Sequence, residues 1–445
     1  MTQQAGAVEP GLHGRVAARE ARVGVVGLGY VGLPLALTFA ARGLAAVGVD
    51  VDPEKPRAIA EGRSYIRHVP AEAIAAAVRA GRLSATSDFA ALSGCDAAIL
   101  CVPTPLTPER EPDLSYVERT AEAIAPHLRA GQLVVLESTT WPGTTEEVVL
   151  PILERGSGLV AGRDFFLAFS PEREDPGSGV STHSIPKVVG GYTPRCLEAA
   201  LALYGAAFDR VVPVSSTRVA ETTKLLENIF RSVNIALVNE LKMLCDRMGM
   251  DVWEIIEAAS TKPFGFMPFQ PGPGLGGHCI PIAPFYLTWK ARQFEFQTRF
   301  IELAGEINTG MPQYVVQRTM EALNDRGAAL KGARVLVLGI AYKKDVDDMR
   351  ESPAIRIIEL LQRRGAQVVY HDPFVPRVPR MRRHRLDMVS VPLTDEALAG
   401  SDAVLIATDH SCVDYARVVE QAPLVVDTRN ACRAVKAGRE KIVKA

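Results

Sequence analysis

The stretch that decides the fold is residues 21–32, ARVGVVGLGYVG, in which a run of small and β-branched residues breaks into glycines. A second apolar run, AAVGVDVDP, follows it and ends a predicted strand at Asp50. Continuous apolar runs of this length are typical of strands buried on both faces of a parallel sheet. Gly27, Gly29 and Gly32 form the pattern GxGxxG directly after the first strand and directly before a predicted helix.

This arrangement predicts a dinucleotide-binding turn. The first glycine permits the tight turn, the second lets the backbone approach a pyrophosphate, and the helix N-terminus supplies amide donors and a favourable dipole. Asp50 lies about 20 residues beyond Gly29, where a carboxylate accepts hydrogen bonds from the adenine ribose. Because a carboxylate repels a 2′-phosphate, NAD is favoured over NADP. The alternative is a structural glycine turn that binds no ligand.

The C-terminal part of the chain repeats the scheme. ARVLVLGIAY, from Ala333, and AQVVYHDP, whose strand ends at Asp372, echo the first two runs, and GSDAVLIATDH resembles the earlier GCDAAILCVPTP. Strands that alternate with helices indicate doubly wound α/β sheets, so we predict an α/β protein with two Rossmann-like parallel-sheet domains. The second turn carries Lys343 and Lys344 instead of close-approach glycines. Either they meet an anionic ligand such as a nucleotide diphosphate, or they are a solvated pair.

A helical segment separates the two predicted sheets. SSTRVAETTKLLENIFRSVNIALVNELKMLCDRMGM, from Ser215 to a stop near Gly249, has helical periodicity throughout. A helix of this length commonly spans domains or lies in a dimer contact. A loop rich in proline and glycine follows it. The predicted organisation is a lead-in over residues 1–20, an NAD-binding domain over 21–214, a helical linker and dimerisation domain over 215–315, and a second Rossmann-like domain over 316–445.

Composition excludes several classes of protein. The 445 residues suggest about three domains, and 47% hydrophobic and 23% charged residues are ordinary globular usage. A net charge of −1 gives no general attraction to nucleic acid or to a membrane surface. The seven cysteines have no paired CxxC spacing, which argues against a disulfide framework and a structural metal site. The chain has no apolar signal core or membrane span, so we expect a cytoplasmic protein.

One cysteine and one helix face are candidates for chemistry. Cys279 lies on the glycine-rich loop PGPGLGGHC, where backbone amides are free to polarise an oxyanion. Its spacing alone leaves a nucleophile and a structural thiol equally open. On the predicted long helix, Lys224, Asn228 and Arg231 form one polar stripe, which is usually a solvated face.

Seven motifs make the chain resemble a known family. They are VGLGYVGLPLA, CVPTP, ESTTWPGTTE, FSPERE, TKLLEN, PGPGLGGHCIPI and KKDVDDMRESPA. Over nearly all of its length after about residue 20 the sequence resembles the UDP-sugar 6-dehydrogenases, NAD-dependent four-electron oxidoreductases. GLGGHCIPI, FYLTWKAR and RFIELAGEIN resemble the branch that oxidises UDP-N-acetylhexosamines, with UDP-N-acetylglucosamine as the expected substrate. The resemblance implies that residues 316–445 bind the UDP-sugar, and that the protein is a homodimer or a higher homo-oligomer.

The resemblance also implies individual roles. Cys279 matches the nucleophile, Lys224 and Asn228 match residues that stabilise charge on the C6 oxygen, Glu172 matches an active-site glutamate, and Thr139 matches a threonine that holds the catalytic water. The implied NAD contacts are Gly27, Gly29, Tyr30, Val31, Gly32, Asp50, Thr104, Thr139 and Arg350. The implied substrate contacts are Glu172, Lys224, Asn228, Phe269, Gln270, Pro271, Gly272, Pro273, Gly276 and Lys343.

One position departs from the family pattern. The family has an aspartate four residues after the cysteine, and this chain has Ala283. Loss of a general base typically costs about 10²–10⁴-fold in rate, so we expect thioester hydrolysis to be impaired, unless a carboxylate such as Glu172 substitutes. The change is either engineered or natural. The alternatives are the same chemistry on UDP-N-acetylmannosamine, UDP-N-acetylgalactosamine or UDP-glucose, and a silent homologue that binds UDP-sugar and NAD without turnover.

Overall fold

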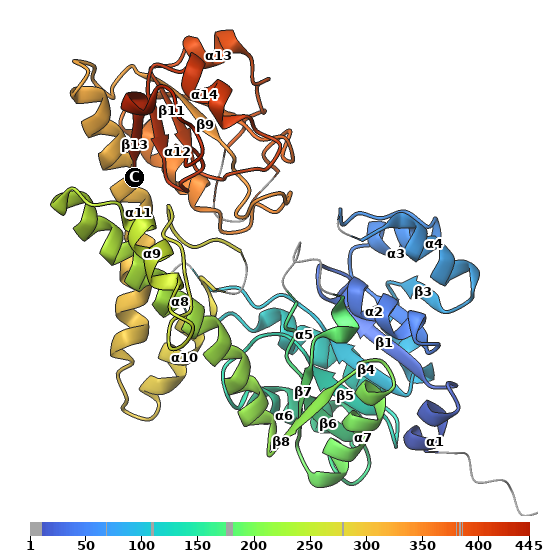
Figure 1. Cartoon of the computed structure of the whole chain (residues 1–445). Coiled ribbons are helices and arrows are strands. Elements are labelled where there is room, and N and C mark those ends of the chain that lie inside the picture. The colour runs from blue at the N-terminus through green and yellow to red at the C-terminus, as the bar shows by residue number, and fades with distance from the viewer. Residues whose placement is uncertain are drawn as a thin grey trace, which may run out of the picture. The chain divides into compact units, whose positions relative to one another are not determined.

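The computed structural model describes residues 11–67, 69–107, 111–174, 181–277, 280–379, 381, 384 and 386–445. The chain divides into two units, each with its own sheet of mostly or wholly parallel strands (Figure 1). The first unit comprises Met1–Glu227 with Phe285–Phe294, and the second comprises Asn228–Pro284 with Glu295–Ala445. The α/β class with two Rossmann-like sheets and a helical central region is confirmed. The domain boundaries proposed from the sequence stay predictions.

The first unit is built on an eight-stranded sheet with the order β3-β2-β1-β4-β5-β6-β7-β8. Neighbouring strands are parallel except β6 and β7, which are antiparallel. The strands are β1 Arg22–Val26, β2 Ala45–Val49, β3 Leu83–Thr86, β4 Ala97–Leu100, β5 Leu133–Leu136, β6 Phe166–Phe169, β7 Lys187–Gly191 and β8 Val211–Val214. The order reverses between β1 and β4, which is where an open α/β sheet binds its ligand.

Helices connect the strands of the first unit. They are α1 Leu12–Ala17, α2 Gly32–Ala41, α3 Glu54–Ala60, α4 Ala71–Arg79, α5 Ser115–Ile124, the π-helix η3 Thr145–Val149, α6 Leu150–Ser157, α7 Pro194–Gly205 and most of α10 Ala283–Arg292. Helix α1 lies inside the predicted lead-in, where Leu12 and Val16 are buried in the hydrophobic core. A six-residue helix is too short to show a clear period in the sequence.

The second unit contains a five-stranded parallel sheet with the order β10-β9-β11-β12-β13. Its strands are β9 Arg334–Leu338, β10 Gln367–His371, β11 Ala403–Ile406, β12 Val425–Asp427 and β13 Ile442–Lys444, and its helices are α9 Val252–Ser260, α11 Arg299–Asn324, α12 Pro353–Arg363, α13 Asp395–Ala399 and α14 Tyr415–Gln421. Along β9, Val335 and Val337 pack into one core cluster, and Leu336 and Leu338 pack into another. The continuous apolar run is therefore buried on both faces, as predicted.

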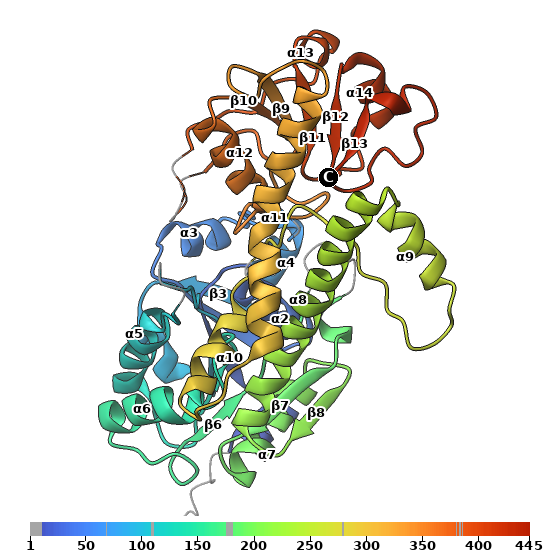
Figure 2. The same cartoon turned by 90° about the vertical axis from the view of Figure 1, so that its left-hand side faces the viewer.

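The long helix predicted between the sheets is present as α8, Thr217–Met248. It begins in the first unit and ends in the second. In the second unit it packs along α11 (Figure 2), where the Asn308 amide donates to Ser232 O at 2.9 Å and the Asn239 amide donates to Asn308 Oδ1 at 2.9 Å. None of the helices in the described ranges is both long enough and apolar enough to cross a membrane.

Candidate functional site

The glycine motif of the first unit forms the turn between β1 and α2. Gly27 has φ of 92°, and its N–H donates to Val49 O at 2.8 Å. A Cβ at Gly27 would lie 2.6 Å from Cys101 O, so a side chain cannot fit there. A Cβ at Gly29 would meet nothing within 4 Å. The turn thus requires glycine at its first position for the fold, while the second leaves the backbone open to a ligand.

The acid at the end of β2 faces this turn. Asp50 accepts hydrogen bonds from Leu28 N at 2.8 Å, from Asp52 N at 3.0 Å and from Lys55 Nζ at 2.8 Å. The carboxylate is buried, whereas the Lys55 side chain is partly exposed. Lys55 is absent from the sequence-based prediction. A base in the first turn after the strand-end acid is the signal that could have found it.

The other cofactor candidates of the first unit lie close to this turn in the sheet. Val31 precedes the first residue of α2, and Tyr30 is partly buried against the core. The hydroxyl of Thr104, which follows β4, donates to Thr139 O, after β5, at 2.8 Å. The structure therefore brings the predicted Thr104 and Thr139 together.

The turn after β5 carries unpaired buried polar atoms. The Thr140 hydroxyl and the Trp141 indole N–H are buried and have no hydrogen-bond partner among the described residues. Trp141 packs against Trp289 of α10, with ring centroids 4.6 Å apart. Buried polar groups are normally satisfied, so these two atoms mark a place where water or a ligand completes the site. The sequence prediction names the neighbouring Thr139 and not these two residues.

Glu172 lies at the partly buried end of a chain of buried charges. Its Oε1 accepts hydrogen bonds from Arg173 N and Glu174 N at 2.6 and 2.7 Å, and its Oε2 lies 3.4 Å from Lys187 Nζ. Lys187 also donates to Glu137 Oε2 at 2.8 Å. Burial and the charge of Glu172 raise the pKa of Glu174 to about 7. Lys187 and Glu137 are 50 residues apart in the chain, so no local pattern predicts the pair.

The three residues of the polar stripe on α8 differ in their exposure to solvent. Arg231 is exposed, as a solvated face requires, but Lys224 and Asn228 are 7% and 3% exposed. The Asn228 amide nitrogen is buried and has no hydrogen-bond partner among the described residues. A solvated helix face is therefore the wrong interpretation for Lys224 and Asn228. Buried polar groups are normally hydrogen-bonded, so the Asn228 amide is left for water or a ligand to satisfy.

The glycine-rich loop of the second unit is tied to α8 and to the loop after β9. Gly272 N donates to Asn239 Oδ1 of α8 at 3.0 Å, and Gly277 N donates to Arg350 O at 2.9 Å. Among the predicted substrate contacts, Gln270 is exposed, Phe269 and Gly276 are partly buried, and Pro271, Gly272 and Pro273 are buried. Cys279 lies outside the described residues. Ala283, at the start of α10, is fully buried.

Cations gather where the strands of the second sheet end. A hollow of about 290 Å³ is lined by Lys344, Asp409, His410, Ser411, Val413, Tyr415, Arg429, Asn430, Ala431 and Arg433. Burial lowers the pKa of Arg429, and a Cβ at Gly272 would lie 2.5 Å from its Nη1. The sequence prediction missed Arg429, which follows the acid at the end of β12 by two residues. Lys344 lines the hollow, and its Nζ lies 3.8 Å from Asp409 Oδ2.

The remaining predicted residues of the second unit belong to the loop after β9. Arg350 forms an ion pair with Asp348 at 2.7 Å, and its side chain is 42% exposed. Lys343 is partly buried. Asp345 in this loop accepts hydrogen bonds from Ser411 N and Oγ at 2.8 and 2.6 Å. The loop is therefore anchored to the segment that follows β11.

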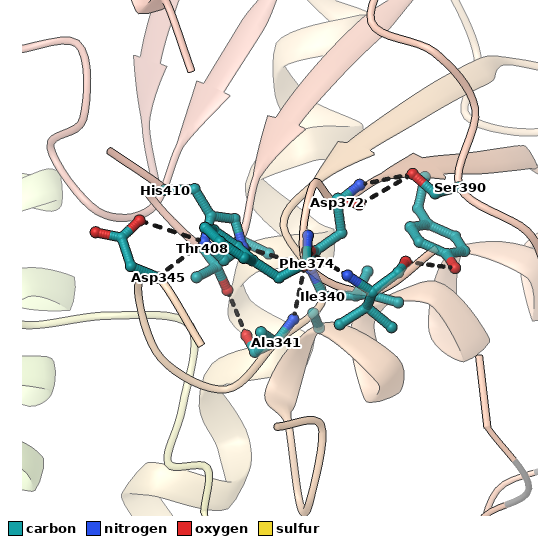
Figure 3. A network of polar contacts seen from close by, with 12 residues as sticks. Ile340, Ala341, Asp345, Asp372, Phe374, Ser390, Thr408 and His410 are labelled. Atoms are coloured by element: carbon teal, nitrogen blue, oxygen red, sulfur yellow. Dashed lines mark hydrogen bonds and ion pairs between the residues drawn. The ribbon is translucent and has the colours of Figure 1, made fainter. Parts of the chain in front are cut away.

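A polar network beneath this loop surrounds Asp372 and His410 (Figure 3). Asp372 Oδ2 accepts from Ile340 N at 2.7 Å and from Ala341 N at 3.0 Å, and it lies 3.1 Å from His410 Nε2. Asp345 N donates to His410 Nδ1 at 3.0 Å. Because Nδ1 accepts, the proton of the neutral ring lies on Nε2 and points at Asp372. Burial opposes ionisation of Asp372, but His410 and the two backbone amides outweigh it and lower its pKa.

The described residues contain no group of three or more His, Cys, Asp or Glu side chains arranged to hold a metal ion. The arrangement that they do contain is a glycine turn with an adjacent acid in one sheet, and a cluster of cations beside a glycine loop in the other. Such sites hold a dinucleotide and a nucleotide diphosphate, respectively.

Comparison with known proteins also identifies one dinucleotide-binding domain and one nucleotide-binding domain. The NAD binding domain of the UDP-glucose/GDP-mannose dehydrogenase family matches residues 21–208, the central domain of that family matches residues 218–310, and its UDP binding domain matches residues 336–434. The UDP-N-acetyl-D-glucosamine 6-dehydrogenase of Pseudomonas aeruginosa is 37% identical over 88% of this chain and 91% of its own length.

Two further relatives act on other sugars by name. An NDP-N-acetyl-D-galactosaminuronic acid dehydrogenase of Ralstonia solanacearum is 36% identical over 92% of this chain and 95% of its own length. The structure of a UDP-D-ManNAc dehydrogenase from Pyrococcus horikoshii has a TM-score of 0.85 at 33% identity, covering 95% of this chain and 98% of that one. With three family domains in order and full-length relatives above 30% identity, the chain belongs to the UDP-glucose/GDP-mannose dehydrogenase family of NAD-dependent enzymes.

Proposed function

We propose that this enzyme oxidises C6 of UDP-N-acetylglucosamine to the carboxylate of UDP-N-acetylglucosaminuronate, a four-electron oxidation that uses two NAD. The observation that carries this proposal is the buried amide of Asn228, which has no partner among the described residues and lies one helical turn beyond the buried Lys224. Fully buried donors without partners are costly. A substrate oxygen would satisfy the amide, and the ammonium of Lys224 would stabilise negative charge that develops on that oxygen.

NAD supplies the hydride acceptor for both oxidations. The residues of the first unit fit it, because Gly29 leaves the backbone open and Asp50 lies at the turn. Thr104 and Thr139 would border the cofactor on the neighbouring strands, and Arg350 is the further NAD contact that the family resemblance implies. Asp50 and Lys55 would hold the adenine ribose.

Cys279 is the proposed nucleophile. After the first oxidation, its thiolate adds to the C6 aldehyde and forms a thiohemiacetal, whose oxygen is protonated. Loss of that proton and of a second hydride leaves a thioester. Water then adds to the thioester carbonyl, the C–S bond breaks, and the cysteine thiol and the uronate are released. Lys224 and Asn228 would stabilise the oxygen-centred charge at each stage.

Hydrolysis of the thioester is the step that we expect to limit the rate. The methyl group of Ala283 can neither bind water nor accept its proton. Thr139, and the unpaired hydroxyl of Thr140 beside it, would hold the attacking water. Glu172 is the acid that we propose as a partial substitute, since Lys187 and two backbone amides hold its carboxylate in place.

The UDP-sugar would bind to the second unit. The hollow beside Arg429 and Lys344 offers positive charge for the diphosphate, and residues 269–273, Gly276 and Lys343 would line the nucleotide and sugar. The named activities of the relatives favour 2-acetamido sugars. The same chemistry on UDP-N-acetylmannosamine, UDP-N-acetylgalactosamine or UDP-glucose is the alternative that substrate comparison tests.

A count of NADH per active site tests the proposal. Excess enzyme is mixed with NAD and each UDP-sugar, and the intact protein is weighed afterwards. We expect two NADH in a burst with UDP-N-acetylglucosamine, added mass on Cys279, and slow turnover. Fast steady turnover would contradict the role given to Ala283. Tight binding of every UDP-hexose by calorimetry without any NADH would identify a silent homologue.

We also propose that the enzyme is a homodimer, or a multiple of one, in the cytoplasm. Helix α8 exposes apolar side chains at spacings of four and seven residues, which share one helix face. They are Leu226, Phe230, Leu237, Leu244 and Met248, which are 45–65% exposed. Covering this stripe with a second copy would bury it. Leu237→Lys should shift the mass measured by light scattering toward the monomer, and an unchanged mass would exclude this face as the interface.

A further inference from the structure

Glu221 is a buried acid to which the proposed chemistry gives no role. It lies on α8 three residues before Lys224, and its side chain is fully buried in the first unit. Carboxylates are almost never fully buried unless strong partners hold them. The partners of Glu221 therefore show what it does.

The carboxylate binds the backbone that follows β5. Oε2 accepts a hydrogen bond from Gly143 N at 2.5 Å, and Oε1 accepts from Thr145 N at 2.9 Å and from the Thr145 hydroxyl at 2.7 Å. Thr145 begins the π-helix η3. The first N–H groups of a helix have no partner within it, and an anion near them is favourable. The Glu221 side chain of α8 thus caps the N-terminus of the π-helix η3.

The local backbone is shaped for this contact. Gly143 has φ of 105°, a conformation that other residues rarely adopt, and a Cβ there would lie 2.5 Å from Glu147 Oε1. π-Helices are rare and occur frequently at functional sites. The capped residues directly follow the turn of residues 139–142, which contains the predicted Thr139 and the unpaired Thr140 hydroxyl.

We propose that ionised Glu221 is a positioning residue, which holds the turn of residues 139–142 in a fixed place against the helix that carries Lys224 during turnover. The inference rests on the proposed roles of Thr139 and Lys224, and Glu221 itself touches neither substrate nor cofactor. Its effect is to fix the spacing between the water-holding turn and the cation that stabilises the C6 oxygen. A small displacement of either group lowers the rate strongly.

The state of the carboxylate makes this contact depend on pH. Burial raises the pKa of Glu221 to about 7, against the hydrogen bonds from Gly143 and Thr145, which lower it. Protonated Oε2 would direct its hydrogen at Gly143 N–H, so that hydrogen bond would be lost. The charged groups around it are Glu146 on η3 and Arg218 on α8, which pair with each other. Glu147 of η3 pairs with Lys290 of α10. The kcat should therefore fall as the pH drops below about 7.

Two variants test the proposal in the whole enzyme, with NADH formation from UDP-N-acetylglucosamine as the assay. Glu221→Gln removes the titrating group, and we expect kcat to fall about 10-fold or more, KM for NAD to stay within about twofold, and the acidic limb of the kcat profile to disappear. Thr145→Val removes one hydrogen bond that favours the ionised form, so the limb should move to higher pH. This milder change keeps the test decisive if Glu221→Gln folds poorly.

A matched control separates positioning from simple capping. Asp96 is another buried acid of the first unit. It accepts a hydrogen bond at 2.9 Å from the N–H of Arg22, the first residue of β1, at the end of the strand away from the glycine turn. Asp96→Asn should lower stability and leave the pH limb unchanged. If the acidic limb of the kcat profile does not move in Thr145→Val, or persists in Glu221→Gln, the proposal is overturned and the proposed function stays intact. A wild type that forms no NADH from any UDP-hexose would overturn both.

Discussion

The first turns of the two sheets have the same backbone and different chemistry. Gly27 and Gly339 both have positive φ, 92° and 77°, and each N–H donates at 2.8 Å to the last residue of the next strand. Leu28 and Ile340 then both donate to the acid at that strand's end. Topology and register are thus shared down to single hydrogen bonds.

The difference lies in what surrounds each acid. Asp50 accepts from one amide of its turn, from Asp52 N and from the partly exposed Lys55, three donors in all. Asp372 has five donors: two amides of its turn, the buried His410, and Phe374 N and Val375 N, which donate to its Oδ1. A carboxylate with that many donors stabilises structure, whereas one beside an open glycine can meet a ribose. The same strand-to-helix turn can therefore serve ligand binding or stability of the fold, and a few side chains around its acid decide which.

The largest effect that we expect comes from Asp372→Asn. The substitution replaces one accepting oxygen with an amide NH2, a donor that faces other buried donors, so the free energy of unfolding should fall by about 3 kcal/mol. Urea denaturation measures this. Asp387→Asn is the control, because its side chain is 93% exposed; its effect should stay within about 0.5 kcal/mol. A loss below about 1 kcal/mol for Asp372→Asn would contradict a structural role.

Gly29→Ala should affect binding and not folding. The added Cβ meets nothing in the protein, so stability should change by less than about 1 kcal/mol. The methyl group would lie where a pyrophosphate approaches, and we expect Kd for NAD to rise about 30-fold, or about 2 kcal/mol. The second sheet already has Ala341 at this position, so Ala341→Gly should leave the affinity for UDP unchanged. Calorimetry with NAD and with UDP measures both.

Asp50→Asn should have a smaller effect on NAD and a qualitative effect on specificity. Loss of the charged acceptor weakens the ribose contact, and Kd for NAD should rise about 10-fold, or about 1.4 kcal/mol. Removing the negative charge also removes the repulsion of a 2′-phosphate, so the preference for NAD over NADP should shrink. Equal losses for both cofactors would show that Asp50 does not contact the ribose.

The smallest effect concerns acid stability. The folded-state pKa of Asp372 lies below its ordinary value of 3.8, so its ionised form stabilises the fold fully above that value. The contribution is lost as pH falls through the folded-state pKa. The stability advantage of wild type over Asp372→Asn should therefore be constant from pH 7 to 5 and shrink toward pH 3. An advantage that grows toward pH 3 would have the wrong sign.

Local patterns predicted the features that depend on neighbours in the chain. The glycine turn, the alternation of strands and helices, and the long helix all follow from residues a few positions apart. The helix predicted from Ser215 to a stop at Gly249 is observed as Thr217–Met248. The pattern alone favours a solvated face for its polar stripe, and only the family resemblance points to Lys224 and Asn228, because a period of 3.6 residues gives a face but not what covers it.

Long-range partners set the remaining features. Lys187 and Glu137, His410 and Asp372, and Glu221 and Gly143 are 38 to 78 residues apart, and each pair meets only after the sheets form. The antiparallel pairing of β6 and β7 has the same origin. The role of Cys279 rests on the family resemblance and stays a prediction.

The unbroken course of α8 has a consequence for how this sequence can change in length. Lys224 belongs to the first unit and Asn228 to the second, yet one helix carries both. Inserting or deleting a single residue between them would turn one side chain by about 100° around the helix axis relative to the other. Surface loops elsewhere absorb such length changes at little cost. Between Lys224 and Asn228, an insertion that keeps every existing side chain would still separate the two groups.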